Sequence, residues 1–116
     1  FGEFNEAIAS QLPPVRQLLI RRHAGSGRKT LYLASHASHI IGTPVEEGRK
    51  LLEELIAFAT QPQFVYQHRW RLGDLVMWDN RCTMHRSRPY DESYKRELHR
   101  TTVSDTANSI EQEMAA

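Results

Sequence analysis

Short apolar runs separated by turn residues dominate the hydrophobic pattern of this chain. Two such runs, residues 15–23 and 28–34, flank an Ala-Gly-Ser-Gly segment. Glycine adopts the positive φ angles of a tight turn at little cost, so the pattern predicts an antiparallel hairpin. Further apolar runs bounded by Gly, Pro, Asp or Asn predict strands over residues 64–70, 75–78, 82–86 and 96–103.

One segment has helical rather than strand periodicity. Thr43 is the expected N-cap, Pro44 the expected first helical residue, and Gln61-Pro62 the expected end. Apolar residues recur between them at helical spacing and form a predicted buried stripe of Leu51, Leu52, Leu55, Ile56 and Ala59. One amphipathic helix among many short strands predicts a β-rich α+β fold of double-stranded or jelly-roll type.

Composition narrows the class of protein. The 116 residues suffice for one modest domain, and 15 Lys+Arg against 14 Asp+Glu give a net charge of +1. Such a balance does not favour a nucleic-acid or membrane-surface protein, and no apolar run approaches the roughly 20 residues of a membrane span. The single cysteine, Cys82, excludes an intrachain disulfide and favours a cytoplasmic setting. Because the chain opens with Phe1, we expect a fragment or a processed product.

His85 is the main candidate for metal chemistry. Neutral imidazole is a good ligand for divalent iron, and two histidines with one carboxylate form the facial triad of non-haem oxygenases. The alternative is a packed histidine that bonds a backbone carbonyl. His36 and His39 have no carboxylate nearby, and Cys82 would point to the opposite strand face from His85, so we expect no metal pair and no thiol nucleophile there.

Arg96 and Arg100 are the candidate anion-binding residues. Residues four apart in a strand share a face and lie roughly 13 Å from each other, at ~3.3 Å per residue. Two guanidinium groups so placed could each bind a different carboxylate in bidentate fashion. The alternative is a pair of exposed surface arginines.

These residues belong to a recognisable pattern, which consists of residues 73–82 (Gly-Asp-Leu-Val-Met-Trp-Asp-Asn-Arg-Cys), then His85-Arg86, Arg96 and His99-Arg100-Thr101-Thr102. The pattern resembles the C-terminal part of the taurine/2,4-dichlorophenoxyacetate dioxygenase (TauD/TfdA) family. Upstream likeness in residues 23–29, 37–39, 44–49 and 59–61 points to the 2,4-dichlorophenoxyacetate branch. The resemblance covers roughly Pro13 to Val103.

The resemblance implies a fold and a set of ligands. It implies the C-terminal portion of a double-stranded β-helix (jelly-roll) dioxygenase, with Fe(II), O2 and α-ketoglutarate as cosubstrate. His85 would be the distal histidine ligand of the iron, Arg96 would hold the far carboxylate of α-ketoglutarate, and Arg100 would hold the anionic group of the substrate. We expect residues 1–12 to be a remnant of an upstream element, residues 13–103 the dioxygenase part, and residues 104–116 a tail.

The implied reaction converts a small anionic substrate, such as the aryloxyalkanoate 2,4-dichlorophenoxyacetate, to a phenol and glyoxylate while succinate and CO2 form. The family's His-x-Asp motif does not occur in this sequence, so we expect the chain alone to be inactive. Two other interpretations stay open: a non-catalytic remnant that acts as a binding or homo-oligomerising module, and an ordinary β-domain in which His85 only packs. Aryloxypropionates and small sulfonates or sulfates also remain open as substrates.

Overall fold

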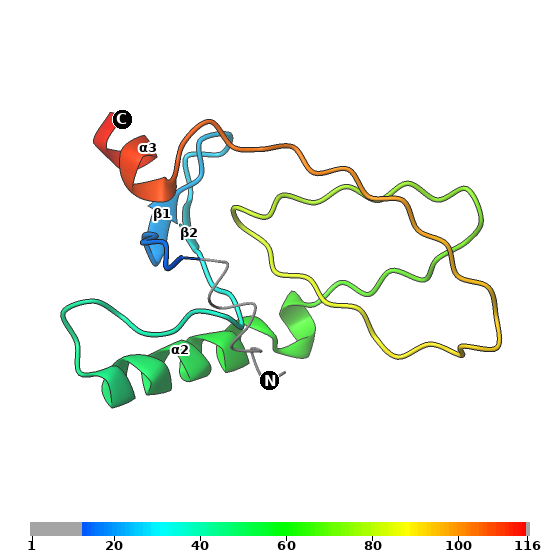
Figure 1. The fold of residues 1–116 in the computed structure, drawn as a ribbon, viewed down its shortest axis with the longest axis horizontal. Helices are drawn as coiled ribbons and strands as arrows, with labels where there is room; N and C mark the ends of the chain where they lie inside the picture. Colours follow the sequence, from blue (N-terminus) through cyan, green and yellow to red (C-terminus); the bar gives the residue numbers. More distant parts are fainter. Residues whose placement is uncertain (1–12, 116) are drawn as a thin grey trace.

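The computed structural model describes residues 13–115, so the expected remnant at residues 1–12 lies outside the described part. Its helices and strands are β1 (Ile20–Arg22), β2 (Lys29–Leu31), α2 (Val45–Ala59), a 3-10 turn η1 (Pro62–Phe64) and α3 (Ser109–Ala115). The two strands, α2 and α3 lie on one side of the molecule, and long loops spread from the other side (Figure 1). No helix in residues 13–115 is both long and apolar enough to cross a membrane.

The predicted hairpin is confirmed, although its strands are shorter than expected. β1 and β2 pair antiparallel, with Arg21 opposite Thr30 at the centre of the register. The backbone N–H of His23 donates to the carbonyl of Arg28 (2.8 Å), and Gly27 at the end of the turn has a φ of 69°. A side chain at that φ would be strained, which is why the turn requires glycine there.

The predicted helix is also confirmed, but its cap is not. The helix starts at Val45 with Pro44 as N-cap residue, and no side chain caps it. Pro44 has an extended ψ of 137°, so Thr43 lies one residue too far from the first turn to cap it. Leu52 is buried; the half-buried residues of the predicted stripe are Leu55, Ile56 and Ala59, whereas Leu51 is exposed.

The predicted strands in the second half of the chain are not formed. Within residues 13–115 the sheet has two strands only, and residues 65–106 contain neither helix nor strand. A strand requires a neighbour that pairs with its backbone and a layer that covers its apolar face. Residues 13–115 supply neither, and large apolar side chains in this region are exposed: Leu72 (108%), Leu75 (93%), Met77 (92%) and Val103 (91%). Within residues 13–115 the structure therefore contains one hairpin and does not form the predicted β-rich fold.

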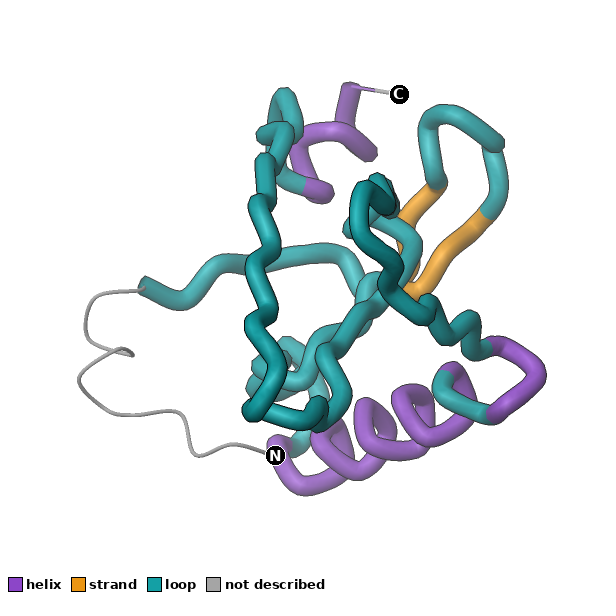
Figure 2. The backbone as a smooth tube through the Cα atoms, turned by 90° about the vertical axis from the view of Figure 1, so that its right-hand side faces the viewer, coloured by secondary structure: helices purple, strands orange, loops and turns teal. Residues whose placement is uncertain are grey.

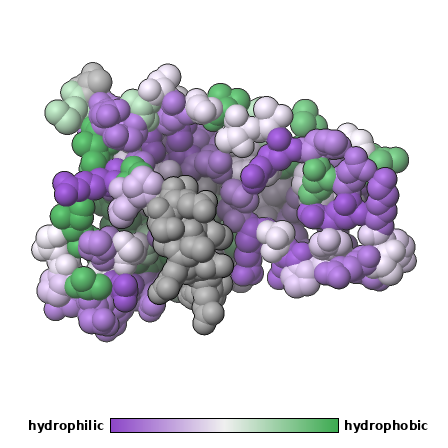
Figure 3. Space-filling model, in the orientation of Figure 1, coloured by the Kyte–Doolittle hydropathy of each residue, from purple (hydrophilic) through white to green (hydrophobic). Residues whose placement is uncertain are grey.

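The core is correspondingly small. In the described part only two apolar side chains are buried, Leu33 and Leu52. The accessible surface is 11060 Å², whereas a compact monomer of this mass exposes about 6,500 Å². The radius of gyration is 16.6 Å, against about 13 Å for a compact domain of similar length. Apolar and polar side chains are mixed over the loops at the right of Figure 3. The chain is thus far more open than a self-contained domain.

The expected tail contains a helix. The side chain of Asn108 accepts hydrogen bonds from the backbone N–H groups of Ile110 (3.1 Å) and Glu111 (3.0 Å), which caps the first turn of α3. The helix contacts β1, where Gln112 accepts a hydrogen bond from Arg21 (2.6 Å). Figure 2 shows α3 at the opposite end of the molecule from α2. The C-terminal segment expected as a tail is therefore helical over Ser109–Ala115.

Candidate functional site

His85 lies against one aromatic ring and is otherwise exposed. Its imidazole centroid is 4.9 Å from the ring of Trp78. The indole N–H of Trp78 in turn donates to the side-chain oxygen of Asn80 (2.8 Å). Trp78, itself held by Asn80, is therefore the side chain against which His85 packs. His85 is exposed, and within residues 13–115 no hydrogen bond engages either of its ring nitrogens.

The two predicted anion-binding arginines are exposed and separate. The guanidinium of Arg96 lies over the ring of Tyr90, 4.8 Å from its centroid. Arg100 makes no hydrogen bond or ion pair with the described residues. None of the hydrogen bonds, ion pairs or ring contacts within residues 13–115 joins His85, Arg96 and Arg100 to one another. The structure thus places each residue but does not assemble them by direct contact.

Asp79 organises the turn that precedes His85. Its backbone carbonyl accepts hydrogen bonds from the N–H of Cys82 (3.3 Å), the N–H of Thr83 (3.0 Å) and the hydroxyl of Thr83 (2.7 Å). A backbone carbonyl that accepts from N–H groups three and four residues further along the chain is typical of a turn. The sequence predicted a turn at residues 79–81, and the structure confirms it.

The carboxylate of Asp79 is the most heavily bonded acidic group in the described part. One oxygen accepts from the backbone N–H and the Nε of Arg81 (both 2.9 Å), and the other accepts from an Nη of Arg81 (2.7 Å). That second oxygen also lies 3.0 Å from Nε2 of His23. Hydrogen bonds from the Arg81 side chain, then from His23, hold the pKa of Asp79 well below its usual range.

The geometry around His23 fixes the position of its proton. The backbone N–H of Ser26 points at Nδ1 of His23 from 3.1 Å. A backbone N–H can only donate, so Nδ1 must be the acceptor and Nε2 must carry the proton. That N–H then donates to Asp79. The sequence did not reveal this pair, because its members are 56 positions apart.

His23, Asp79 and Cys82 could also be considered as a metal site. Their ligand atoms lie within 4.8 Å of one another, and imidazole, carboxylate and thiolate all bind zinc or iron. However, Nε2 of His23 carries a proton rather than a free lone pair, and the Arg81 cation already occupies the carboxylate. The arrangement therefore fits a hydrogen-bonded network better than a cation site.

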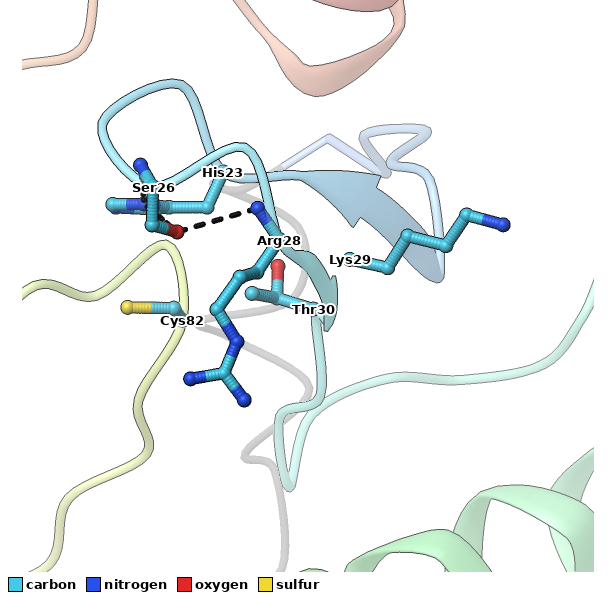
Figure 4. A pocket seen from close by; sticks show the side chains of 6 residues that line it. All are labelled: His23, Ser26, Arg28, Lys29, Thr30 and Cys82. Carbon is cyan, nitrogen blue, oxygen red and sulfur yellow. Dashed lines mark hydrogen bonds between the residues drawn. The ribbon is translucent and has the colours of Figure 1, made fainter.

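This network lies at the edge of a surface cavity of about 360 Å³, lined by His23, Ser26, Arg28, Lys29, Thr30 and Cys82. Cys82 is exposed and lies beside the hairpin turn that carries His23 and Ser26 (Figure 4). The loop of Asp79 and the β1–β2 hairpin thus meet at this cavity.

The donor set around His85 is incomplete for iron within the described part. A facial triad needs two further ligands, one of them a carboxylate. In residues 13–115 no cluster of three metal-ligating side chains includes His85. Within residues 13–115, His85 therefore lacks the two partners that a facial triad requires.

Comparison with known proteins gives consistent matches. The family model for the taurine catabolism dioxygenase TauD, TfdA family matches residues 2–102. The chain is 58% identical over 105 residues to the alpha-ketoglutarate-dependent 2,4-dichlorophenoxyacetate dioxygenase of Cupriavidus pinatubonensis, covering 90% of this chain and 37% of that protein. It is 60% identical over 101 residues to the protein of the same description from a Burkholderia strain, covering 87% and 34%. The chain thus spans about a third of the length of these relatives.

A solved structure also matches closely. The crystal structure of AAD-2 in complex with Mn(II) and N-oxalylglycine superposes with a TM-score of 0.83 at 50% sequence identity. The match covers 92% of this chain and 42% of that one. Most of the present backbone, including much of its loop region, therefore follows the path of a segment in a larger protein.

Proposed function

The chain belongs to the taurine catabolism dioxygenase TauD, TfdA family, and on that premise we propose that it forms part of an Fe(II)- and α-ketoglutarate-dependent dioxygenase that acts on a small aryloxyalkanoate. The observation that carries the proposal is the superposition on AAD-2, a protein whose structure holds Mn(II) and N-oxalylglycine. N-oxalylglycine carries the two carboxylates of α-ketoglutarate at a similar separation. The 2,4-dichlorophenoxyacetate dioxygenases at 58% and 60% identity suggest the substrate class.

We propose that residues 13–103 are the C-terminal part of a jelly-roll domain. The loops over residues 65–106 expose the apolar residues that the sequence pattern predicts for strands. The accessible surface of 11060 Å² includes these exposed residues. A second layer of the domain could cover their side chains and pair with their backbone. The segments would become strands when the rest of the domain is present.

His85 is the proposed iron ligand. Its ring nitrogens are unbonded within the described part, and its ring rests against Trp78, which limits its orientations. Iron, when bound, would supply the oxidation chemistry with O2 and the keto acid. His85 itself would contribute one neutral imidazole nitrogen to that site, and the other ligands would come from outside residues 13–115.

Arg96 and Arg100 are the proposed carboxylate-binding residues. The guanidinium of Arg96 lies over the ring of Tyr90 and makes no hydrogen bond or ion pair with the described residues, so its N–H groups could form a bidentate contact with the distal carboxylate of α-ketoglutarate. Arg100 would bind the carboxylate of the substrate and fix which C–H bond faces the oxidant. For 2,4-dichlorophenoxyacetate the products would be a phenol and glyoxylate, with succinate and CO2 from the keto acid.

A chimaera tests the proposal. The segment of the Cupriavidus pinatubonensis dioxygenase that aligns with this chain would be replaced by residues 1–116. We expect the chimaera to convert 2,4-dichlorophenoxyacetate in the presence of Fe(II) and α-ketoglutarate. His85→Ala should abolish turnover, whereas His99→Ala, at an exposed histidine that contacts Glu97, should leave it intact. A folded but inactive chimaera, or an active His85→Ala variant, would refute the proposal and favour a non-catalytic module.

A further inference from the structure

Asp79 connects two parts of the molecule that are distant in sequence. Through its backbone carbonyl it holds the turn at residues 79–83, and through its carboxylate it binds Arg81 within that turn. The same carboxylate accepts a hydrogen bond from His23, which lies directly after β1. His23 and Asp79 are both shielded, with 16% and 33% of their side chains exposed. This contact therefore anchors the turn to the β1–β2 hairpin.

In the hydrogen bond between the hairpin and the turn, His23 is the donor and Asp79 is the acceptor. Because Ser26 N–H occupies Nδ1 of His23, the only ring proton points from Nε2 toward Asp79. His23 is itself held by the hairpin, since its backbone N–H bonds Arg28 and its carbonyl accepts from Gly27. The Nε2–H group of His23 is thus held in place by the hairpin. Because this group binds the Asp79 carboxylate, a shift of the hairpin would also shift that carboxylate.

The anchored turn extends directly to His85. Trp78 precedes Asp79, and its indole N–H is fixed by Asn80 inside the same turn. The Trp78 ring then contacts the His85 ring at 4.9 Å. A path therefore runs from His23 by a hydrogen bond to Asp79, along the backbone to Trp78, and by a ring contact to His85.

We propose that Asp79 is a positioning residue for His85, which couples the β1–β2 hairpin, through His23, to the orientation of the Trp78–His85 pair. This inference rests on the proposed role of His85 as an iron ligand, but the coupling itself is a property of the chain without metal. Partners outside the ligand shell commonly orient metal-binding histidines, and their loss lowers metal affinity about 10–100-fold.

The decisive measurement is nuclear magnetic resonance on the 116-residue chain without metal. The 15N shifts of His23 should report protonated Nε2, and a nuclear Overhauser effect should connect the rings of Trp78 and His85. His23→Ala should remove this ring-to-ring signal, and His23→Gln, whose amide can still donate to Asp79, should restore it. Asp79→Asn should also remove it.

A matched control is available elsewhere in the chain. Nε2 of His68 also lies 3.0 Å from an aspartate oxygen, that of Asp74, at similar exposure. His68→Ala should therefore leave the Trp78–His85 signal unchanged. If the signal survives in His23→Ala and Asp79→Asn, the inference is overturned. Should Asp79→Asn unfold the hairpin, the comparison of His23→Ala with His23→Gln still decides: neither change removes a bond within residues 79–83, and both lose the bond from Ser26 N–H to Nδ1, so they differ in the bond to Asp79.

The chimaera separates this inference from the proposed function. There, His23→Ala should raise the Fe(II) concentration for half-maximal activity about 10–100-fold, with the Michaelis constant for α-ketoglutarate unchanged. An inactive chimaera together with loss of the ring-to-ring signal in His23→Ala would refute the proposed function and retain the positioning role. If instead the chimaera is active, and His23→Ala changes neither its iron requirement nor the Trp78–His85 signal, the proposed function is retained and the positioning role is refuted.

Discussion

The hydroxyl of Ser109 accepts a hydrogen bond from the backbone N–H of Leu18 at 2.7 Å, across 91 positions of the sequence. The same hydroxyl donates to the side-chain carbonyl of Gln17 (2.5 Å), and Ser109 is 2% exposed. The first residue of α3 thereby attaches the C-terminal helix to the segment that leads into β1.

Removal of that hydroxyl should destabilise the chain measurably. We expect Ser109→Ala to lower the free energy of unfolding by about 1 kcal/mol, because it leaves the half-buried N–H of Leu18 without its partner and removes one of the two hydrogen bonds that the amide oxygen of Gln17 accepts from Ser109. Urea unfolding and amide exchange at Leu18 would measure the effect. Ser93→Ala, which removes an exposed local bond to Asp91, serves as control and should change little. Equal effects of the two variants would be inconsistent with this view.

Arg21 and Arg22 offer a second matched comparison, because they are adjacent in β1 but face opposite environments. Arg21 is 7% exposed, bonds Gln112 at 2.6 Å and lies over the ring of Tyr32. Arg22 is exposed and bonds the carbonyl of Gly27. We expect Arg21→Ala to cost about 2 kcal/mol of unfolding free energy and Arg22→Ala about 0.5 or less. Thermal and urea unfolding would test the difference, and a larger loss for Arg22→Ala would reject it.

The two proposed carboxylate-binding arginines should separate kinetically in the chimaera. Arg96→Ala should raise the Michaelis constant for α-ketoglutarate, and Arg100→Ala the Michaelis constant for the aryloxyacetate. Each effect should be about 10–100-fold, as expected for a charged bidentate contact. Lys95→Ala, at an exposed residue paired with Glu97, is the control. If Arg96→Ala left the Michaelis constant for α-ketoglutarate unchanged, Arg96 would not be the residue that binds its distal carboxylate.

Acid stability should depend on Asp79. Its pKa is lowered in the folded state, first by the Arg81 side chain and then by His23. A carboxyl with a lowered pKa stabilises the fold fully above its unfolded-state pKa of about 3.9, and this contribution is lost as the pH falls toward the folded-state value. We therefore expect Asp79→Asn to be destabilised near pH 7 and to lose less further stability than the parent on going to about pH 3. Urea unfolding at several pH values would measure the free energy of unfolding of both proteins. If it fell by the same amount in Asp79→Asn and in the parent, Asp79 would not make this contribution.

Elements that depend on local signals were predictable from the sequence. The apolar spacing between Leu51 and Ala59 identified α2, and the Gly-rich turn identified the hairpin. The predicted strands failed because alternation specifies a face to be buried but not the partner that buries it. Leu75 and Met77 show this: they fit a strand pattern, yet nothing in the described part covers them. The helix α3 had a readable signal, since Asn108 followed by Glu111 resembles a capping pattern.

For the candidate site too, the sequence indicated residues that are close along the chain but not contacts between distant residues. The sequence indicated His85, Trp78 and Asn80 as members of one short motif. It could not indicate that His23 donates to Asp79, since a contact across 56 positions depends on how the hairpin and the turn meet. Whether Arg96 and Arg100 converge with His85 on one cavity stays a prediction.

The buried pair of Leu33 and Leu52 has a calorimetric consequence. The heat-capacity increment of unfolding arises mainly from newly hydrated apolar surface and averages about 12–15 cal/mol/K per residue in compact domains. In the folded chain most apolar side chains are already hydrated, so unfolding on heating exposes little additional apolar surface and the heat-capacity increment is small. The thermogram of the chain should be broad and shallow, and it should sharpen into a cooperative peak when the complementary polypeptide is supplied.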